Sequence, residues 1–471
     1  MQTPYFCIDA DKLEDNLRIL RGVMDRTGCK ILLAQKCFSC YDLYPLIRKY
    51  LAGATASGIY EARLCHEHMV TSADAVNGNT VSDNANKSMP HVENHIFSPA
   101  YKECDIDEIL SICDHIVFNS PRQLMLYGER AKAAGLQVGL RINPECSTQE
   151  GHAIYDPCAP GSRLGTTLDV FESFFSIPTG RAEESLLPPL NGRGRGLRAG
   201  ESLLLDGLHF HTLCEQNSDD LERTLDAVEE KFGKYLHQMK WINFGGGHHI
   251  TRDDYDIPRL EHCIRRMQER YGLQVYLEPG EAVALNAGTL HSTVLEVQPQ
   301  GTDGIANVIL DTSAACHMPD VIEMPYTPPI VSPQLYRPNP TTQQPSNPTT
   351  QQPNNQTTKQ LNNQTTKQLN DQTTKQLNDQ TTKQLNDQTT KQPYRYRFGG
   401  PTCLSGDVIG DYALAAPLHE GDEVVFGDMA IYSMVKTNTF NGMPLPDIYI
   451  KKGETLRLWK HFSYDDFKSR L

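Results

Sequence analysis

The sequence predicts an α/β fold: a closed (β/α)8 barrel of the TIM type, followed by a C-terminal all-β domain built as a sandwich or a barrel. Three observations lead to this prediction. Eight short apolar runs occur between residues 31 and 277, helical patterns separate several of them, and beyond about residue 290 strand patterns follow one another without helices. Short buried strands that alternate with helices are typical of parallel βα units, and eight such units favour a closed barrel.

The first expected helix starts at a capping pair, Asp11 with Glu14, and continues with apolar residues at helical spacing, Leu13, Leu17 and Leu20. Eight short apolar segments then follow, each expected to be one strand of the barrel. They are Ile31–Ala34, Ala54–Ala56, His95–Phe97, Ile116–Phe118, Val138–Ile142, Leu208–Phe210, Ile242–Phe244 and Val275–Leu277.

The clearest later helix is predicted from one apolar face and from Asp219 and Glu222 as its capping pair. The apolar face consists of Leu221, Leu225, Val228, Phe232 and Leu236. In the all-β domain, four segments have strand patterns. They are Ser292–Val297, Val308–Leu310, Glu423–Phe426 and Asp447–Ile450.

A low-complexity segment interrupts the all-β domain. From Gln356 the motif Gln-Thr-Thr-Lys recurs every eight residues, and each unit offers at most one leucine. Such units bury too little apolar surface to offset their ordering entropy, so we expect residues 338–392 to be a disordered insert without chemistry. Two smaller polar inserts, Ser72 to Pro90 and Thr179 to Gly200, are interpreted in the same way.

Charge and cysteine content limit the class of protein. With 44 Lys and Arg against 58 Asp and Glu, the net charge is −14, which argues against nucleic acid or an anionic membrane as the partner. The 13 cysteines are scattered singly apart from Cys37 and Cys40, so neither a disulfide framework nor a metal site is expected. There is no membrane-spanning apolar run and no signal pattern, and the expected location is the cytoplasm.

Polar residues at the carboxyl ends of barrel strands indicate an active site. Lys36 follows the first strand, and an amine in an apolar setting is more readily in the neutral form that attacks a carbonyl carbon. Gly245–Gly247 follow a later strand and could wrap a phosphate with bare backbone N–H groups. His211 could stack on an aromatic ring or act as an acid, and Glu278 could hold a proton on a ring nitrogen.

Each of these residues also has a structural interpretation. The lysine could extend to solvent, the glycines could form an ordinary turn, and the histidine and glutamate could be satisfied core residues. Together, however, an aldehyde-capturing lysine, a phosphate cradle, a stacking ring and a pyridinium partner predict a pyridoxal 5'-phosphate site.

The sequence resembles the fold-type III, alanine racemase-like pyridoxal-phosphate decarboxylases, and within them the carboxynorspermidine/carboxyspermidine decarboxylase branch. Leu404 stands where a diaminopimelate enzyme is expected to have Glu. The segments that carry the resemblance are Thr3–Phe6, Ala34–Phe38, Leu208–Glu215, Asn243–Gly247, Leu277–Glu281, Cys316–Asp320 and Gly400–Asp407.

The resemblance implies a barrel over residues 8–290 and a β-domain formed by residues 1–7, 291–337 and 393–471. It also implies a homodimer with shared active sites, in which Cys403 and Asp407 enter the partner's site. The implied cofactor-binding residues are Lys36, His211, Gly245, Gly246, Gly247, Glu278, Gly280 and Tyr432.

The expected reaction is decarboxylation of carboxynorspermidine or carboxyspermidine to norspermidine or spermidine in polyamine biosynthesis, with Lys36 and Cys403 as the catalytic residues. Glu278, Asp311, Asp407 and Glu215 are the substrate-binding candidates, and Asp320 and Glu281 are further candidates for the distal amines. Alternatives are a diaminopimelate decarboxylase, an amino-acid racemase, or a non-catalytic carrier of the cofactor. Such carriers lack the β-domain and a residue of the Cys403 type.

Overall fold

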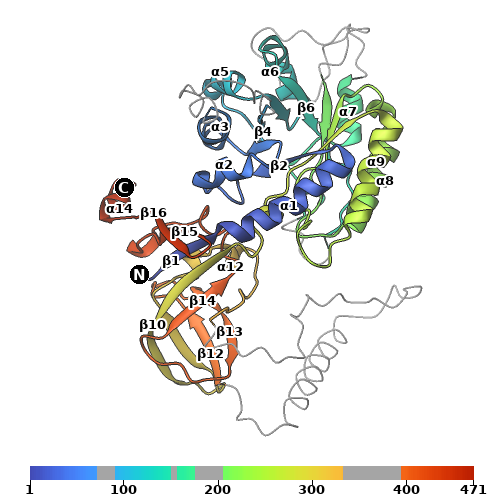
Figure 1. Cartoon of the computed structure of the whole chain (residues 1–471). Helices are drawn as coiled ribbons and strands as arrows, with labels where there is room; N and C mark the ends of the chain where they lie inside the picture. Colours follow the sequence, from blue (N-terminus) through green and yellow to red (C-terminus); the bar gives the residue numbers. More distant parts are fainter. Residues whose placement is uncertain (72–90, 150–155, 176–204, 333–393) are drawn as a thin grey trace, which may run out of the picture.

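The computed structural model describes residues 1–71, 91–149, 156–175, 205–332 and 394–471 (Figure 1). The three inserts expected from the sequence lie outside these described residues. Within them, no helix combines the length and the apolar character that crossing a membrane requires.

Eight parallel strands form a closed barrel, which confirms the predicted fold class. Each of the eight expected segments is a strand, with ends shifted by at most two residues, and β2 pairs with β9 to close the ring. The strands are β2 (Lys30–Ala34), β3 (Gly53–Ala56), β4 (Glu93–Phe97), β5 (His115–Phe118), β6 (Gln137–Arg141), β7 (Gly207–His209), β8 (Trp241–Asn243) and β9 (Gln274–Leu277).

Helices cover the outside of the barrel (Figure 1). They are α1 (Ala10–Thr27), α2 (Tyr44–Ile47), α3 (Ile59–Cys65), α5 (Glu103–Ile112), α6 (Pro121–Ala133), α7 (Leu168–Phe175), α8 (Ser218–Leu236), α9 (Ile257–Tyr271) and α10 (Glu281–Ala284), with a 3-10 turn at Tyr41–Leu43 and a π turn at His66–Val70. The apolar faces predicted for α1 and α8 are both buried.

The helix starts differ from the predicted capping pairs. Helix α1 is capped by Asp9, whose carboxylate accepts hydrogen bonds from the next backbone N–H groups at 3.1 Å, while Glu14 accepts one from the hydroxyl of Tyr50. Helix α8 is capped by Asn217, not Asp219. In both helices, the capping residue is the last one with an extended backbone, and its side chain reaches the free N–H groups of the first turn.

A second sheet has the strand order β13-β12-β11-β10-β1-β15-β16, with β14 also paired to β10. The strands are β1 (Tyr5–Asp9), β10 (Gly288–Gln300), β11 (Ala306–Leu310), β12 (Tyr394–Gly399), β13 (Val408–Leu414), β14 (Glu423–Gly427), β15 (Asp447–Lys452) and β16 (Thr455–Lys460). The first strand therefore belongs to the C-terminal sheet, as the family resemblance implied. The boundaries proposed near residues 8 and 290 fall within β1 and β10.

The β-domain also contains short helices, so the expectation of strands without helices is wrong in this detail. They are α11 (Ala314–His317), α12 (Asp320–Glu323), α14 (Tyr464–Lys468) and a 3-10 turn at Phe440–Gly442. Helix α11 is capped by the hydroxyl of Ser313, which accepts from the backbone N–H of Cys316 at 3.2 Å. The helices α11 and α12 follow β11 directly, and α12 brings an acidic residue, Asp320, to the barrel.

Side chains fill the interior of the barrel. The ring of Trp241 occupies the space that a Cβ atom on Gly139 or Gly207 would need, at 2.4 and 2.0 Å from the nearest ring atoms. Beside it, His95 Nε2 donates to the carboxylate of Glu93 at 2.9 Å, and the ammonium of Lys30 also binds this carboxylate. Because Lys30 already neutralises the carboxylate of Glu93, we assign the cluster of Glu93, His95 and Lys30 a structural role.

Candidate active site

A cavity of about 580 Å³ lies at the carboxyl ends of the barrel strands. Ten residues singled out in the sequence line it: Lys36, His211, Glu215, Gly246, Gly247, Glu278, Gly280, Glu281, Asp320 and Tyr432. Three cations with no role assigned from the sequence also line the cavity: Arg141, Arg163 and Lys436. The cavity therefore joins residues in or after five barrel strands to residues that follow β11 and β14.

Lys36 lies in the turn directly after β2. The buried neighbours Gln35 and Cys37 fix this turn through backbone hydrogen bonds, Gln35 N to Thr55 O at 3.2 Å and Cys37 N to Ala34 O at 3.1 Å. The side chain of Lys36 is exposed to the cavity, and no described residue forms a hydrogen bond or salt bridge with its ammonium. The amine is thus available to a carbonyl group that enters the cavity.

Glu278 is a buried carboxylate immediately after β9. Its Oε1 accepts a hydrogen bond from Asn243 Nδ2 at 2.8 Å, and its Oε2 lies 3.3 Å from His209 Nε2. Burial by itself would raise the pKa of Glu278, but the hydrogen bond and charge of His209, with help from His95 and Asn243, outweigh it and lower the pKa to about 2. Glu278 is therefore ionised at neutral pH and is a suitable partner for a protonated ring nitrogen.

Neither of these supporting residues was identified from the sequence as functional. His209 and Asn243 lie inside strands β7 and β8, where they were counted only as parts of strand patterns. Burial lowers the pKa of His209, while the hydrogen bond and charge of Glu278 act in the opposite direction, and Nε2 carries the hydrogen that faces the carboxylate. The available signal was the alternation in His209-Phe210-His211, which turns both histidines toward one side of the strand.

The glycines after β8 permit a close approach of backbone segments. Gly245 and Gly247 have positive φ angles of 70° and 82°, and a Cβ atom on Gly246 would lie 2.8 Å from the carbonyl oxygen of Glu278. Gly280 is equally confined, because its Cβ atom would lie 2.4 Å from that of Cys37. Gly245 itself lies behind the cavity wall, while the other three glycines form a backbone surface that suits a phosphate.

His211 is oriented by this glycine loop. Its Nδ1 accepts a hydrogen bond of 2.8 Å from the backbone N–H of Gly246. Burial, together with the positive charge of Lys36, holds the pKa of His211 well below its usual value. The ring is therefore neutral, with its hydrogen on Nε2, and can stack on a flat heterocycle in the cavity.

An acidic side of the cavity is formed by Glu215 and Glu281. Glu281 Oε2 lies 2.5 Å from His249 Nε2. Burial, followed by the negative charge of Glu281, raises the pKa of Glu215 to about 7. Glu215 also has a positive φ of 57°, a backbone conformation that is costly for a residue other than glycine. These two side chains place carboxyl groups in the cavity, and a cationic ligand bound there would stabilise their ionised form.

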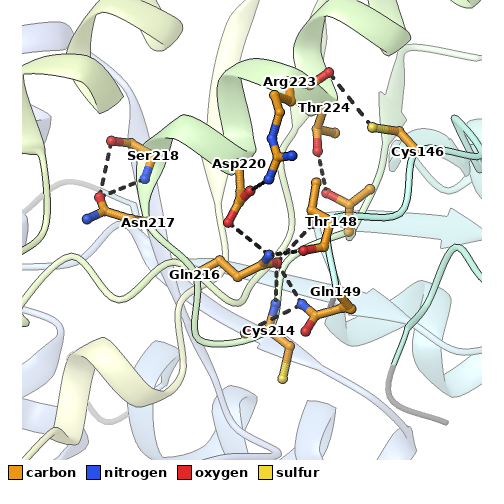
Figure 2. Close-up of polar contacts among 11 residues, drawn as sticks. Cys146, Thr148, Gln149, Cys214, Gln216, Asn217, Ser218, Asp220, Arg223 and Thr224 are labelled. Carbon is orange, nitrogen blue, oxygen red and sulfur yellow. Dashed lines mark hydrogen bonds and ion pairs between the residues drawn. The ribbon is translucent and has the colours of Figure 1, made fainter. Parts of the chain in front are cut away.

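Gln216 holds the loop that carries Glu215, as Figure 2 shows. Its Nε2 donates to Thr148 O at 2.6 Å and to Asp220 Oδ2 at 2.9 Å, and its Oε1 accepts from Gln149 Nε2 at 2.6 Å and from Thr148 Oγ1 at 2.9 Å. One side-chain amide thus joins the loop after β6 to the loop after β7. No local pattern predicts this role, because Gln216 and Thr148 are 68 residues apart in the chain.

Tyr432 connects the β-domain to the lysine turn. Its backbone N–H donates to the carbonyl oxygen of Cys37 at 3.0 Å. Burial raises the pKa of Tyr432 well above its usual value, so the phenol stays neutral and can donate a hydrogen bond. Tyr432 therefore enters the cavity of its own barrel, close to Lys36.

Besides Gly245, three predicted site residues lie outside the cavity of their own chain. Cys403 is exposed, and Asp407 is buried, where it accepts hydrogen bonds from the Ser313 and Thr402 hydroxyl groups at 2.7–2.9 Å. Asp311 accepts from Ser292 Oγ at 2.8 Å and from the backbone N–H of Thr293 at 2.9 Å, within the β-domain. Their assignments to the site stay predictions.

The residues present fit pyridoxal phosphate. The unpaired amine of Lys36 suits its aldehyde, the glycine surface suits its phosphate, and the ionised Glu278 suits its ring nitrogen. A (β/α)8 barrel with this site and an added β-sheet defines the class: a fold-type III pyridoxal-phosphate enzyme.

Comparisons with known proteins agree. The family described as pyridoxal-dependent decarboxylase, C-terminal sheet domain, matches residues 354–430. A carboxynorspermidine/carboxyspermidine decarboxylase of Campylobacter jejuni is 34% identical over the whole chain and 98% of its own length, and a carboxyaminopropylagmatine decarboxylase of Synechocystis is 31% identical over the whole chain and 96% of its own length. The chain belongs to the carboxynorspermidine/carboxyspermidine decarboxylase family, and it is a pyridoxal-phosphate-dependent enzyme.

Solved structures support the same fold. The crystal structure of carboxynorspermidine decarboxylase from Campylobacter jejuni, complexed with norspermidine, has a TM-score of 0.71 at 32% identity, with all of both chains covered. Diaminopimelate decarboxylase from Helicobacter pylori has a TM-score of 0.68 at 15% identity, covering all of this chain and 98% of that one, and it shows likeness of fold alone.

Proposed function

We propose that this enzyme decarboxylates carboxynorspermidine, carboxyspermidine or both, to norspermidine and spermidine in polyamine biosynthesis. The observation that carries the proposal is the composition of the cavity. Lys36 and Glu278, which suit the cofactor, lie in the same cavity as the carboxylates of Glu215, Glu281 and Asp320, which suit a substrate with distal amines.

The bound cofactor supplies an electron sink for the pair of electrons left when CO2 departs. Lys36 would attach the cofactor and release the product, while Glu278 would keep the proton on the ring nitrogen. The Gly246–Gly247 backbone, Gly280 and Tyr432 would hold the phosphate, and His211 would stack against the ring. Gly245 supports this site from behind the cavity wall, where it orients the loop that holds His211.

Cys403 is proposed to return a proton to the reacting carbon in the partner's site, within a homodimer. Its exposure, next to the exposed apolar side chains of Leu404 and Val408, supports this placement. Glu215 is the distal-amine contact that the geometry of one chain favours, and Asp407 and Asp311 complete the proposed substrate-binding set. The cytoplasm is the proposed location, since all 13 cysteines are free thiols, as a reducing compartment would keep them.

The shared site can be tested by mixing two inactive variants, Lys36→Ala and Cys403→Ala. Statistical mixing makes half of the dimers heterodimers, each with one intact site of two, so about a quarter of wild-type activity is expected. Each variant alone should be inactive. No recovery, with subunit exchange confirmed by mass spectrometry, would show that the site is built within one chain.

The substrate is tested by incubating the purified holoenzyme with carboxynorspermidine, carboxyspermidine, carboxyaminopropylagmatine and diaminopimelate in parallel. CO2 release and chromatography of the amine product are the two readouts. We expect norspermidine or spermidine to form fastest. Preferential formation of lysine would support a diaminopimelate decarboxylase. A racemised product would support a racemase, and no turnover of any substrate would support a cofactor carrier.

A further inference from the structure

Lys436 is one of three cations of the cavity that have no role in the proposed reaction. Lys436 lies in the segment after β14, and its ammonium contacts two carboxylates of α12: Asp320, in an ion pair, and Glu323, whose Oε2 lies at 2.6 Å. The same ammonium lies 5.5 Å from the centre of the Tyr432 ring. Lys436 thus has a primary ammonium enclosed by two carboxylates and an aromatic ring.

These surroundings are what a site for an alkylammonium ligand requires. Carboxylates provide charge-assisted hydrogen bonds to the ammonium, and an aromatic face adds cation–π attraction within about 6 Å. The tip of a lysine, an ammonium on a flexible alkyl chain, is chemically the same group as the terminal amine of a polyamine. Lys436 and a distal amine of the substrate would therefore compete for the same partners.

The charge balance around α12 favours a cation at this position. Burial raises the pKa of Asp320 although Lys436 acts in the opposite direction, and the negative charges of Glu323 and Glu281 add to the rise. For Lys436 itself, burial would lower the pKa, but its bonds to Asp320 and Glu323 outweigh that effect and raise it, so the amine is protonated. The carboxylates need an ammonium, and Lys436 supplies one.

We propose that Lys436 occupies, in the substrate-free enzyme, the subsite for a distal ammonium group of the substrate and is displaced when the substrate binds. This inference rests on the proposed function. The side chain is 32% exposed, so on displacement its ammonium can move into water along a stem with four rotatable bonds. A ligand without a distal amine cannot take over the two carboxylates, and Lys436 then stays in place, which adds selectivity for polyamines.

The test measures the affinity of norspermidine for the holoenzyme by titration calorimetry. Lys436→Met keeps the length of the side chain and removes the competing charge, so the Kd of norspermidine should fall by about fivefold, the value of one partly exposed ion pair. Lys231→Met is the matched control. Lys231 lies on the outer helix α8, is 28% exposed, and binds Glu145 Oε2 at 3.1 Å and Pro144 O at 2.6 Å. The Kd of norspermidine for this control variant should equal that for the wild type.

A second pair of variants tests the subsite itself. Asp320→Asn should weaken norspermidine binding in the Lys436→Met background, because the ligand ammonium then loses one of its carboxylates. An unchanged or higher Kd for Lys436→Met would overturn the proposal and make Lys436 a residue that orders α12. If Lys436→Met does not fold, Lys436→Gln gives the same comparison. Absence of decarboxylation by the wild type would instead refute the proposed function, so the two failures are distinguishable.

Discussion

Replacing Glu278 with glutamine tests the electrostatic design of the site. The change keeps the volume of the side chain and its hydrogen bond from Asn243, whose Nδ2 lies 2.8 Å from Oε1. It removes the negative charge that faces His209. Glutamine therefore resembles the protonated form of Glu278. The difference in the free energy of unfolding between the wild type and the variant reports how much ionisation of this carboxyl contributes to stability.

The expected loss of stability follows from the pKa of this carboxyl. At about 1.4 kcal/mol for each tenfold change in the proton equilibrium, a fall in the pKa of Glu278 from 4.5 to about 2 corresponds to about 3 kcal/mol at neutral pH. Because the pKa is lowered on folding, this stability is present above pH 4.5 and is lost as the pH falls through about 2. The difference in the free energy of unfolding between wild type and variant should therefore be about 1 kcal/mol smaller at roughly pH 3.5 than at neutral pH.

Urea unfolding of the cofactor-free proteins at neutral and acidic pH measures this difference. Glu261→Gln is the control, because Glu261 has the same 10% side-chain exposure and lies on α9, outside the cavity. In the holoenzyme, loss of a charge-assisted partner of the ring nitrogen should lower kcat by about tenfold to a hundredfold. Unchanged stability at neutral pH together with an unchanged kcat would refute this account of Glu278.

Two further predictions follow from the cavity walls. Lys36→Ala should abolish turnover and the visible absorbance band of lysine-bound pyridoxal phosphate, and a band that persists would identify another lysine as the anchor. Gln216→Leu should lower the free energy of unfolding by about 2–3 kcal/mol, because it leaves the partners of five hydrogen bonds unsatisfied, and should raise KM more than it lowers kcat. Equal effects on KM and kcat would contradict the role of Gln216 in placing Glu215.

The barrel was predictable because its signal is local. Each strand is buried on both faces, so its sequence is a short apolar run between polar stretches. The strands β12 and β16 were not predicted, because they are not buried on both faces and so lack such a run. In β12 only Tyr396 and Phe398 are buried and arginines alternate with them, and in β16 Leu456 and Leu458 are exposed. The alternation in β12 was the available signal for that strand.

The site was predictable only in part. Lys36, the glycines and Glu278 follow strands directly, so strand positions alone bring them together at one end of the barrel. Lys436 and Asp320 are 116 residues apart, and the fold of the β-domain brings them together. A lysine in an irregular segment after β14 carries no sequence signal that separates it from a surface lysine.

The division of labour between the two domains follows from these placements. The barrel supplies the groups that suit the cofactor apart from Tyr432, which comes from the segment after β14 together with Lys436, and α12 supplies Asp320 to the same cavity. One backbone hydrogen bond, from Tyr432 to Cys37, connects that segment to the turn that holds Lys36. Because the cofactor groups are fixed by strand ends, the length and charge of α12 can change without moving them. Specificity for the distal part of a substrate can therefore vary among relatives while the cofactor chemistry stays the same.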